Sequence, residues 1–389
     1  TRAMAIPFTV MEEKVSGTQV KKMRRFILWT RSHNFREHSD EYLPQLPDLK
    51  HVSAFLHAVR HEAATVRDLR LSFFQVEIPV WARACYRFVD DEGRLMEMTR
   101  LPMGHMCSPE IMQAIASVLA GDPRFCRPEF SLKVASRTVW VDNIRLTGSR
   151  EEMKAAAAWL DRTAAAVNAT WKEEDSLTSA TDYDFLGGRW RHEDCSVAVS
   201  QKNLDKFPAE VPDFLSFGET ERLVGRLVHA SGLTNTPLLR YYWVMKWFRR
   251  RVNAFNSGRE EYDEAREVPA AVKANLGHWI AAVGKPHIVA AFPEEERVAT
   301  LITDASLHGW GAILVSPRQQ IFVAGAQWKE PKTAAQINEL EGMALSNALG
   351  EFRVAFDGID ANFLRVVVDN TSVQHALRRT CTSSEAMAM

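Results

Sequence analysis

The run from Val139 to Ser149 is apolar on both sides of one polar pair, Asp142-Asn143. Asp and Asn tolerate the backbone angles of a tight turn, so the pair is expected at the tip of a β-hairpin. A carboxylate on a rigid hairpin tip could hold a metal ion against a substrate phosphate. Taken alone, the same pair is also an ordinary turn. The apolar residues that suit the two strands are Val139, Val141, Ile144 and Leu146.

A second carboxylate, Asp68, lies at the end of a predicted strand. The pattern predicts that this strand starts at Val66 and continues through Phe73 to Ile78. A further strand over 84–89 is expected to pair with it across the turn at Pro79. An acid at a strand end is commonly solvated, and Asp68 gains a chemical role if the fold places it beside Asp142.

More acids stand in the C-terminal part of the chain. Asp304 and Asp369 each end an apolar strand pattern, and both Glu339 and Glu341 lie in a predicted helix over 333–352. The predicted order of elements is βββαβα. Three carboxylates brought together would repel one another unless cations neutralise them, so a two-metal nuclease site is the natural interpretation.

The elements that must position these acids follow from the periodicity. Residues 1–37 predict two antiparallel strands with a basic tip, which is either a solvated lysine turn or a set of cations for a triphosphate. Residues 48–66 have a helical period. Residues 101–109 predict a Pro- and Gly-containing loop, and Ser108 at its end is expected to cap a helix over 110–120. A helix is expected over 151–167, a strand with a glycine bend over 181–190, and mainly helix over 200–285.

Tryptophans and cations alternate between residues 243 and 251, an arrangement that suits either a duplex backbone or an amphipathic core helix. The residues of this segment that could bind nucleic acid are Lys246, Trp247, Arg249, Arg250 and Arg251.

Composition limits the class of protein. The 389 residues are 46% hydrophobic and 25% charged with a net charge of −1, which is typical of a soluble globular protein of two to four domains without an overall basic field. The five cysteines have no paired spacing, which disfavours a disulfide framework or a zinc site and fits an intracellular location, cytoplasmic or nuclear. No apolar run approaches the roughly 20 residues of a membrane span. The chain begins without Met and is expected to be a segment of a longer polypeptide.

In this order, the stretches resemble the reverse transcriptase–ribonuclease H region of a retrotransposon polyprotein, similar to tyrosine-recombinase (DIRS-like) elements and trypanosome VIPER-type elements. The resemblance covers about residues 5 to 379, and several motifs occur in sequence. It implies an α+β fold, namely a right-hand polymerase with fingers, palm and thumb, followed by an α/β ribonuclease H-like domain. The implied domains are fingers and palm over 1–195, thumb and connection over 196–285, a linker over 286–297, and a C-terminally incomplete ribonuclease H-like domain over 298–389.

The resemblance assigns roles position by position. Asp68 in Asp-Leu-Arg-Leu-Ser-Phe-Phe and Asp142 in Trp-Val-Asp-Asn match the polymerase metal ligands, and Asp304, Glu341 and Asp369 match three acids of ribonuclease H. Glu341 is preferred to Glu339 because the small residues after it then fall at the family's offsets. The implied substrate-binding residues are Arg25, Lys22 (with Lys21 as an alternative), Phe73, Met103, Gly104, Gln113 and Asn143. The implied primer grip is Phe185, Leu186, Gly187 and Gly188.

The sequence departs from the family at four points. Asn143 replaces the third polymerase carboxylate, and an amide can ligate a metal without contributing charge. Trp140 replaces the common Tyr. The lysine expected after the helix as a proton donor is not in clear register, and Lys172 is the nearest candidate. The fourth ribonuclease H acid has no match.

The expected activity is template-directed DNA synthesis with two Mg²⁺ ions per active site, for which Mn²⁺ could substitute. The expected partners are an RNA template, a DNA primer, an RNA–DNA hybrid and dNTPs, with no membrane; the sequence leaves the oligomeric state open. Two alternatives remain: a decayed polymerase fold that binds nucleic acid as a scaffold, and a ribonuclease H nuclease with an inert polymerase half.

Overall fold

The computed structural model describes residues 5–16, 19–30, 52–290, 297–330, 333 and 337–379. The chain divides into two compact units: Thr1–Tyr183 with Trp190–Cys195, and Asp184–Arg189 with Ser196–Met389. Helices and strands are mixed in both units, and none of the helices in the described ranges is long and apolar enough to cross a membrane.

The first unit opens with an antiparallel hairpin of β1 (Ile6–Ser16) and β2 (Gln19–Trp29), which confirms the two predicted N-terminal strands. Residues 17 and 18 of its turn lie outside the described residues. Leu28 is fully buried, and its N–H donates to the Met103 carbonyl at 2.9 Å. The hairpin is therefore fixed to the loop that precedes α3.

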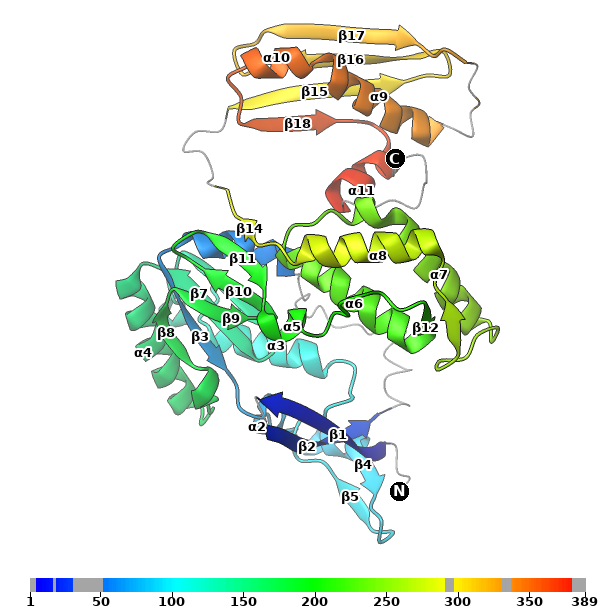
Figure 1. The fold of residues 1–389 in the computed structure, drawn as a ribbon. Coiled ribbons are helices and arrows are strands. Elements are labelled where there is room, and N and C mark those ends of the chain that lie inside the picture. Colours follow the sequence, from blue (N-terminus) through cyan, green and yellow to red (C-terminus); the bar gives the residue numbers. More distant parts are fainter. Residues whose placement is uncertain are drawn as a thin grey trace. The chain divides into compact units, whose positions relative to one another are not determined.

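A four-stranded antiparallel sheet in the order β6-β7-β3-β8 forms the centre of the first unit (Figure 1). Its strands are β3 (Ala63–Asp68), β6 (Ser136–Trp140), β7 (Asn143–Gly148) and β8 (Leu177–Ala180). Helices α3 (Ser108–Leu119) and α4 (Arg150–Ala166) match the predicted helices. Both helices share a buried core with the sheet, in which Met112 and Met153 surround Ile144. The strand ends at Asp68 and Asn143 therefore belong to a sheet that packs on a buried core.

The segment after β3 differs from the prediction. The chain does not continue as a strand through Phe73, because Leu71 has a left-handed φ of 50° and the short helix α2 (Ser72–Gln75) follows. Residues 84–89 also do not pair with it: η2 (Val80–Tyr86) leads into β4 (Arg87–Val89), which pairs with β5 (Leu95–Glu97). Upstream, the predicted helix is the 3-10 helix η1 (Val52–Arg60), and residues 48–51 lie outside the described part.

The chain passes between the two units in the hairpin of β9 (Asp182–Phe185) and β10 (Gly188–Arg191), which confirms the predicted strand and glycine bend. These strands belong to a sheet in the order β14-β11-β10-β9, completed by β11 (Ser196–Val199) and β14 (His287–Ile288). β14 occupies part of the predicted linker, of which residues 291–296 are not described.

Helices dominate residues 200–285, as predicted. They are α5 (Gln201–Leu204), α6 (Phe217–Leu233), α7 (Tyr242–Asn256) and α8 (Ala270–Val283). Stacked aromatic rings join α6 to α7, with Phe217 and Phe255 at 4.5 Å between centroids, and Trp279 of α8 donates to Ser231 of α6 at 2.7 Å. Short elements complete the first and second units: η3 (Pro128–Phe130), η4 (Glu173–Asp175), β12 (Phe214–Ser216), η5 (Leu238–Tyr241) and β13 (Ala265–Glu267).

The described residues after the predicted linker form a third four-stranded sheet in the order β17-β16-β15-β18, with β15 and β18 parallel. Its strands are β15 (Val298–Ala305), β16 (Gly309–Val315), β17 (Ile321–Gln327) and β18 (Phe363–Val367). Helix α9 (Ile337–Glu351) packs on the face that carries Leu301 and Leu314. The predicted βββαβα order is present, with α10 (Arg353–Gly358) added before β18 and α11 (Thr371–Arg379) at the end.

Candidate active sites

The β6–β7 hairpin turns at Val141 and Asp142, because Trp140 already pairs with Asn143. The expectation of an Asp142-Asn143 tip is therefore wrong by one residue, and Val141 belongs to the turn and not to a strand. Val141 has a φ of 54°, an uncommon conformation for a β-branched residue. Backbone strain of this kind persists only where the surroundings enforce it.

Gln113 enforces this turn from α3. It is buried, its Nε2 donates to the Val139 carbonyl at 2.9 Å, and its Oε1 accepts from the Val141 N–H at 2.6 Å. The amide spans the two residues that enter the turn. Both ends of the Gln113 side chain are thus bound to the hairpin, and its expected role in substrate binding stays a prediction.

Asp68 lies at the same end of the sheet as Asp142. The register of β3 and β7 places Asp68 opposite Asn143, and the N–H of Leu69 donates to the Asp142 carbonyl at 3.1 Å. Two acids 74 positions apart in the sequence thus stand on neighbouring strand ends (68 and 142). Both are half-buried, so their side chains are accessible.

The Asp142 carboxylate accepts two hydrogen bonds. Ser72 Oγ donates to Oδ2 at 3.1 Å, and Asn143 Nδ2 donates to Oδ1 at 3.0 Å. Asn143, which replaces the third carboxylate of the family, therefore donates to the carboxylate of Asp142. Ser72 was missed by the sequence reasoning, since a serine at the start of a four-residue helix carries no recognisable motif.

Lys172 is the cation of this site. Its Nζ lies 3.8 Å from Asp68 Oδ2 and also pairs with Asp175, and its backbone N–H donates to the Asp68 carbonyl at 2.8 Å. The structure thus brings Lys172, the nearest lysine candidate of the sequence analysis, to the first acid.

The predicted substrate-binding residues occupy three elements. Phe73 of α2 packs against the core under the acids, and Met103 accepts the hydrogen bond from β2. Gly104 has a φ of 109°, and a Cβ there would lie 2.7 Å from the Leu28 carbonyl oxygen, so glycine is required. On β2, Lys22 is exposed and Arg25 half-buried, whereas the side chain of the alternative, Lys21, lies outside the described part.

The predicted primer grip is the β9–β10 turn, where Leu186 and Gly187 have φ values of 48° and 78°. Two side chains support its exposed carbonyls. His229 Nε2 donates to the Leu186 carbonyl at 2.9 Å, and Asn203 Nδ2 donates to the Gly187 carbonyl at 3.1 Å. Phe185 is buried behind the turn, as is the backbone of Gly188 in β10.

A basic face on α6 was also missed. Arg222, Arg226 and His229 recur at helical spacing, and that spacing was the available signal. Arg222 and Arg226 line a depression of about 500 Å³ together with Lys206 and Phe207, and the acids Asp205 and Glu219 also line it. Burial and the charges of Lys202 and Arg226 lower the pKa of Lys206. Three cations thus line the depression beside two acids.

The basic segment of α7 is divided by its packing. Arg249 and Arg250 are exposed, and Lys246 lies over the Trp243 ring at 4.8 Å. Arg251 is buried in an ion pair with Glu260 and donates to Thr220 Oγ1 at 2.7 Å. The expected contact of Arg251 with nucleic acid is therefore wrong. Trp247 is half-buried under the Arg251 guanidinium at 5.4 Å.

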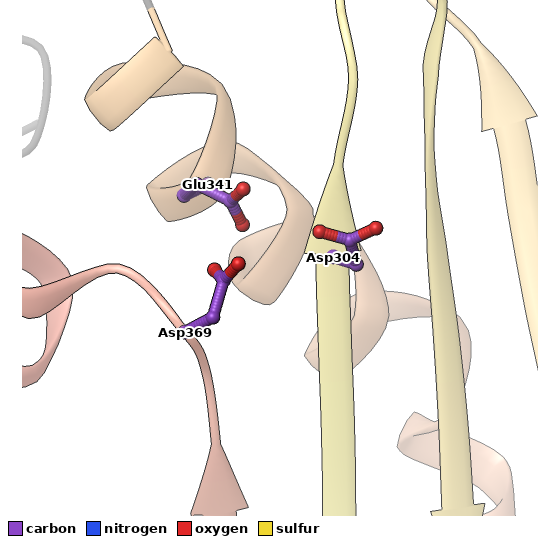
Figure 2. A group of neighbouring side chains, drawn as sticks. All are labelled: Asp304, Glu341 and Asp369. Carbon is purple, nitrogen blue, oxygen red and sulfur yellow. The ribbon is translucent and has the colours of Figure 1, made fainter.

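Asp304, Glu341 and Asp369 converge from β15, α9 and the residues after β18, as Figure 2 shows. One carboxylate oxygen from each lies within 4.8 Å of the others. Glu341 is buried, and its Oε2 has no hydrogen-bond partner among the described residues. Burial, and then the charges of Asp369 and Asp304, raise the pKa of Glu341 above its ordinary value. Crowded carboxylates with an unsatisfied buried oxygen fit a divalent cation.

No model of a known protein family and no curated protein sequence matches the chain. Solved structures do match. A foamy viral protease-reverse transcriptase dRH in complex with double-stranded DNA is 15% identical with a TM-score of 0.53, and covers 99% of this chain and 63% of its own. The foamy viral protease-reverse transcriptase with an RNA/DNA hybrid is 14% identical with a TM-score of 0.56, covering 98% and 48%. A foamy viral protease-reverse transcriptase in complex with double-stranded DNA is 14% identical with a TM-score of 0.51, and the match covers 96% of this chain and 73% of that one.

The chain thus spans less than two thirds of the length of the first two structures that it matches. The likeness extends over nearly all of its own residues. The chain has a mixed α/β fold of the reverse-transcriptase kind.

Proposed function

We propose that the chain is the RNA-directed DNA polymerase of a retrotransposon, of the DIRS-like or VIPER type, with an attached ribonuclease H domain. The observation that carries the proposal is the pairing of Asp68 with Asn143, which brings the first acid against the turn that holds Asp142. The foamy viral structures with the same fold hold double-stranded DNA or an RNA/DNA hybrid, which supports the same classes of partner here.

In this proposal the fingers and palm comprise residues 1–195, the thumb and connection 196–285, and the ribonuclease H-like domain 298–389, after a linker over 286–297. The acids on β3 and the β6–β7 turn then belong to the palm. The β9–β10 turn would be the primer grip.

Asp68 and Asp142 offer carboxylate oxygens, and Asn143 offers an amide, which is the hard-donor chemistry that Mg²⁺ and Mn²⁺ prefer. These residues would hold two Mg²⁺ ions. Mg²⁺ bound there would acidify the primer 3′-hydroxyl and neutralise the triphosphate.

The chain's own side chains would do the rest. Lys172, 3.8 Å from Asp68 Oδ2, would give a proton to the departing pyrophosphate. Arg25 and Lys22 would bind triphosphate oxygens, and Phe73 would stand against the sugar and exclude a 2′-hydroxyl. The Met103–Gly104 loop would form the floor of the nucleotide pocket.

The basic face of α6 and the exposed Arg249 and Arg250 of α7 would hold duplex phosphates without reading sequence. The carbonyls of the β9–β10 turn would lie against the primer strand. Contacts of this kind bind RNA–DNA hybrid and DNA duplex alike, as a polymerase that converts one to the other requires.

Asp304, Glu341 and Asp369 would hold divalent ions for hydrolysis of RNA in a hybrid. This cluster also supports a second candidate function, a hybrid-cleaving nuclease with an inert polymerase half. The nuclease site has three carboxylates, whereas Asn143 leaves the polymerase site with two. The same asparagine motivates the scaffold alternative.

Primer extension on poly(A)–oligo(dT), with Mg²⁺ or Mn²⁺, tests the proposal. We expect incorporation by the wild type, loss with Asp142→Ala, and no change with Asp91→Asn, which alters an exposed acid in the β4–β5 turn. No incorporation by a folded wild type, with Asn143→Asp also inactive, favours the scaffold. Hybrid cleavage that survives Asp142→Ala, stops with Asp304→Asn and occurs without extension favours the nuclease.

A further inference from the structure

Ser72 is a buried serine whose hydroxyl donates to Asp142 Oδ2 at 3.1 Å. The opposite oxygen, Oδ1, accepts from Asn143 Nδ2 at 3.0 Å. Both oxygens of one carboxylate are thus held by neutral donors from two different elements, the start of α2 and the start of β7.

The position of Ser72 depends on the turn that follows Asp68. Leu71 adopts a φ of 50°, and the N–H of Phe74 donates back to the Leu71 carbonyl at 2.9 Å. This reversal, which replaces the predicted continuation of the strand, directs the chain back toward the hairpin. The segment that carries the first acid therefore also supplies the donor for the second.

Two hydrogen bonds fix the rotation of a carboxylate about its Cβ–Cγ bond. A carboxylate has about four lone-pair positions, so two accepted bonds leave two positions for a cation. A charged third ligand at 143 would repel Asp142, whereas the amide found there attracts it. An oriented carboxylate loses less side-chain freedom when it binds an ion.

We propose that Ser72 is a positioning residue for Asp142. Its hydroxyl, together with the Asn143 amide, holds the carboxylate in the orientation that binds a divalent ion before the ion arrives. The inference rests on the proposed polymerase site, and it assigns to that site a residue with no role in the chemistry itself.

Direct binding of Mn²⁺, measured by electron paramagnetic resonance without nucleic acid, tests the inference separately from activity. The full chain carries Asp304→Asn throughout, so that the C-terminal cluster does not contribute. We expect Ser72→Ala to weaken Mn²⁺ binding about five- to twenty-fold, in keeping with the loss of one oriented hydrogen bond to a charged group. Ser72→Thr, which keeps the hydroxyl, is expected to restore most of the affinity.

Ser117→Ala is the matched control, because Ser117 is also buried and its hydroxyl donates only to the Gln113 carbonyl, at 2.7 Å. It should bind Mn²⁺ like its parent. The inference is overturned if Ser72→Ala binds Mn²⁺ as tightly as its parent. It is also overturned if Asp142→Asn removes none of the Mn²⁺ binding that the parent shows.

Asn143→Asp provides a second test if Ser72→Ala does not fold. The variant replaces the amide donor by a like charge, so it should unfold at a lower temperature than the wild type without metal, and Mn²⁺ should raise its Tm more than that of the wild type. An unchanged metal-free Tm contradicts the inference.

In primer extension, Ser72→Ala should raise the Mg²⁺ concentration for half-maximal rate by the same five- to twenty-fold, with a smaller change in kcat. Weakened Mn²⁺ binding in a protein that extends no primer would refute the polymerase and leave the positioning role of Ser72 intact.

Discussion

At the scale of single residues, Glu341 combines burial with two neighbouring carboxylates. These raise its pKa above the ordinary 4.5, so between 4.5 and the raised value the folded state holds a proton that the unfolded state has released. Without divalent ions, the contribution of Glu341 to the free energy of unfolding therefore falls as the pH rises through this interval.

Glu341→Gln removes the charge whose burial beside Asp304 and Asp369 destabilises the folded state. In EDTA at pH 7 we expect a higher Tm for the variant than for the wild type, and the difference should close when the pH falls below 4.5. Mg²⁺ should raise the Tm of the wild type but not of the variant. Glu339→Gln, on the same helix but outside the cluster, is the control, and a Glu341→Gln protein that still gains stability from Mg²⁺ would contradict the metal assignment.

Gln113 supports a second prediction at this scale. Gln113→Leu leaves the Val139 carbonyl and the Val141 N–H without their partner, so we expect a loss of roughly 2 kcal/mol in the free energy of unfolding by urea titration. The strained turn should also relax, and primer extension should fall further than in Ser117→Ala. Ser117→Ala removes one buried hydrogen bond on the same helix without touching the hairpin. Equal primer extension by the two variants would contradict the role of the Gln113 side chain in holding the hairpin turn.

At the scale of elements, the loop before α3 and the β1–β2 hairpin meet at Gly104. A methyl group there would meet the Leu28 carbonyl at 2.7 Å in a backbone conformation that L residues rarely adopt. We expect Gly104→Ala to cost about 2 kcal/mol or more and to speed amide hydrogen exchange in β2. Gly93→Ala is the matched control: its φ of 77° is also positive, but nothing lies within 4 Å, so only the backbone strain of about 1 kcal/mol applies. Similar losses in both variants would mean that the contact with Leu28 adds nothing.

The basic face of α6 makes a prediction about nucleic acid. If Arg222 and Arg226 each hold one phosphate, their replacement by Gln should lower hybrid affinity and reduce the slope of log K against log salt by about 0.9 each. Arg162→Gln, an exposed arginine of α4, should leave the slope unchanged. An unchanged slope in the α6 variants would remove this face from the proposed interface.

The elements also show where sequence reasoning succeeded. The apolar strand patterns place Asp304 and Asp369 at strand ends, and the resemblance to the family selects Glu341 over Glu339; the structure brings these three acids together. The reversal at Leu71 could not be foreseen, since leucine has no intrinsic preference for a left-handed turn. Arg251 was misassigned because its partner Glu260 lies in a later loop, and only tertiary packing reveals that pairing. Ser72 was missed for the same reason, because only the fold brings its hydroxyl to Asp142.

At the scale of the whole molecule, the motifs predicted a reverse-transcriptase-like fold, and solved structures at 14–15% identity share it. The polymerase activity proposed for this fold depends on one spatial relation that the backbone supports, the approach of Asp68 to the turn at Asp142. Residues that act as a unit on the same ions lose their function together.

Single-turnover primer extension by Asp68→Asn, Asp142→Asn and the double variant tests this relation most directly. We predict that each single variant lowers the rate by roughly 100-fold or more, and that the double variant is no slower than the slower of the two. A wild-type rate in either single variant, or losses that multiply in the double variant, would contradict a shared metal site formed by these two acids.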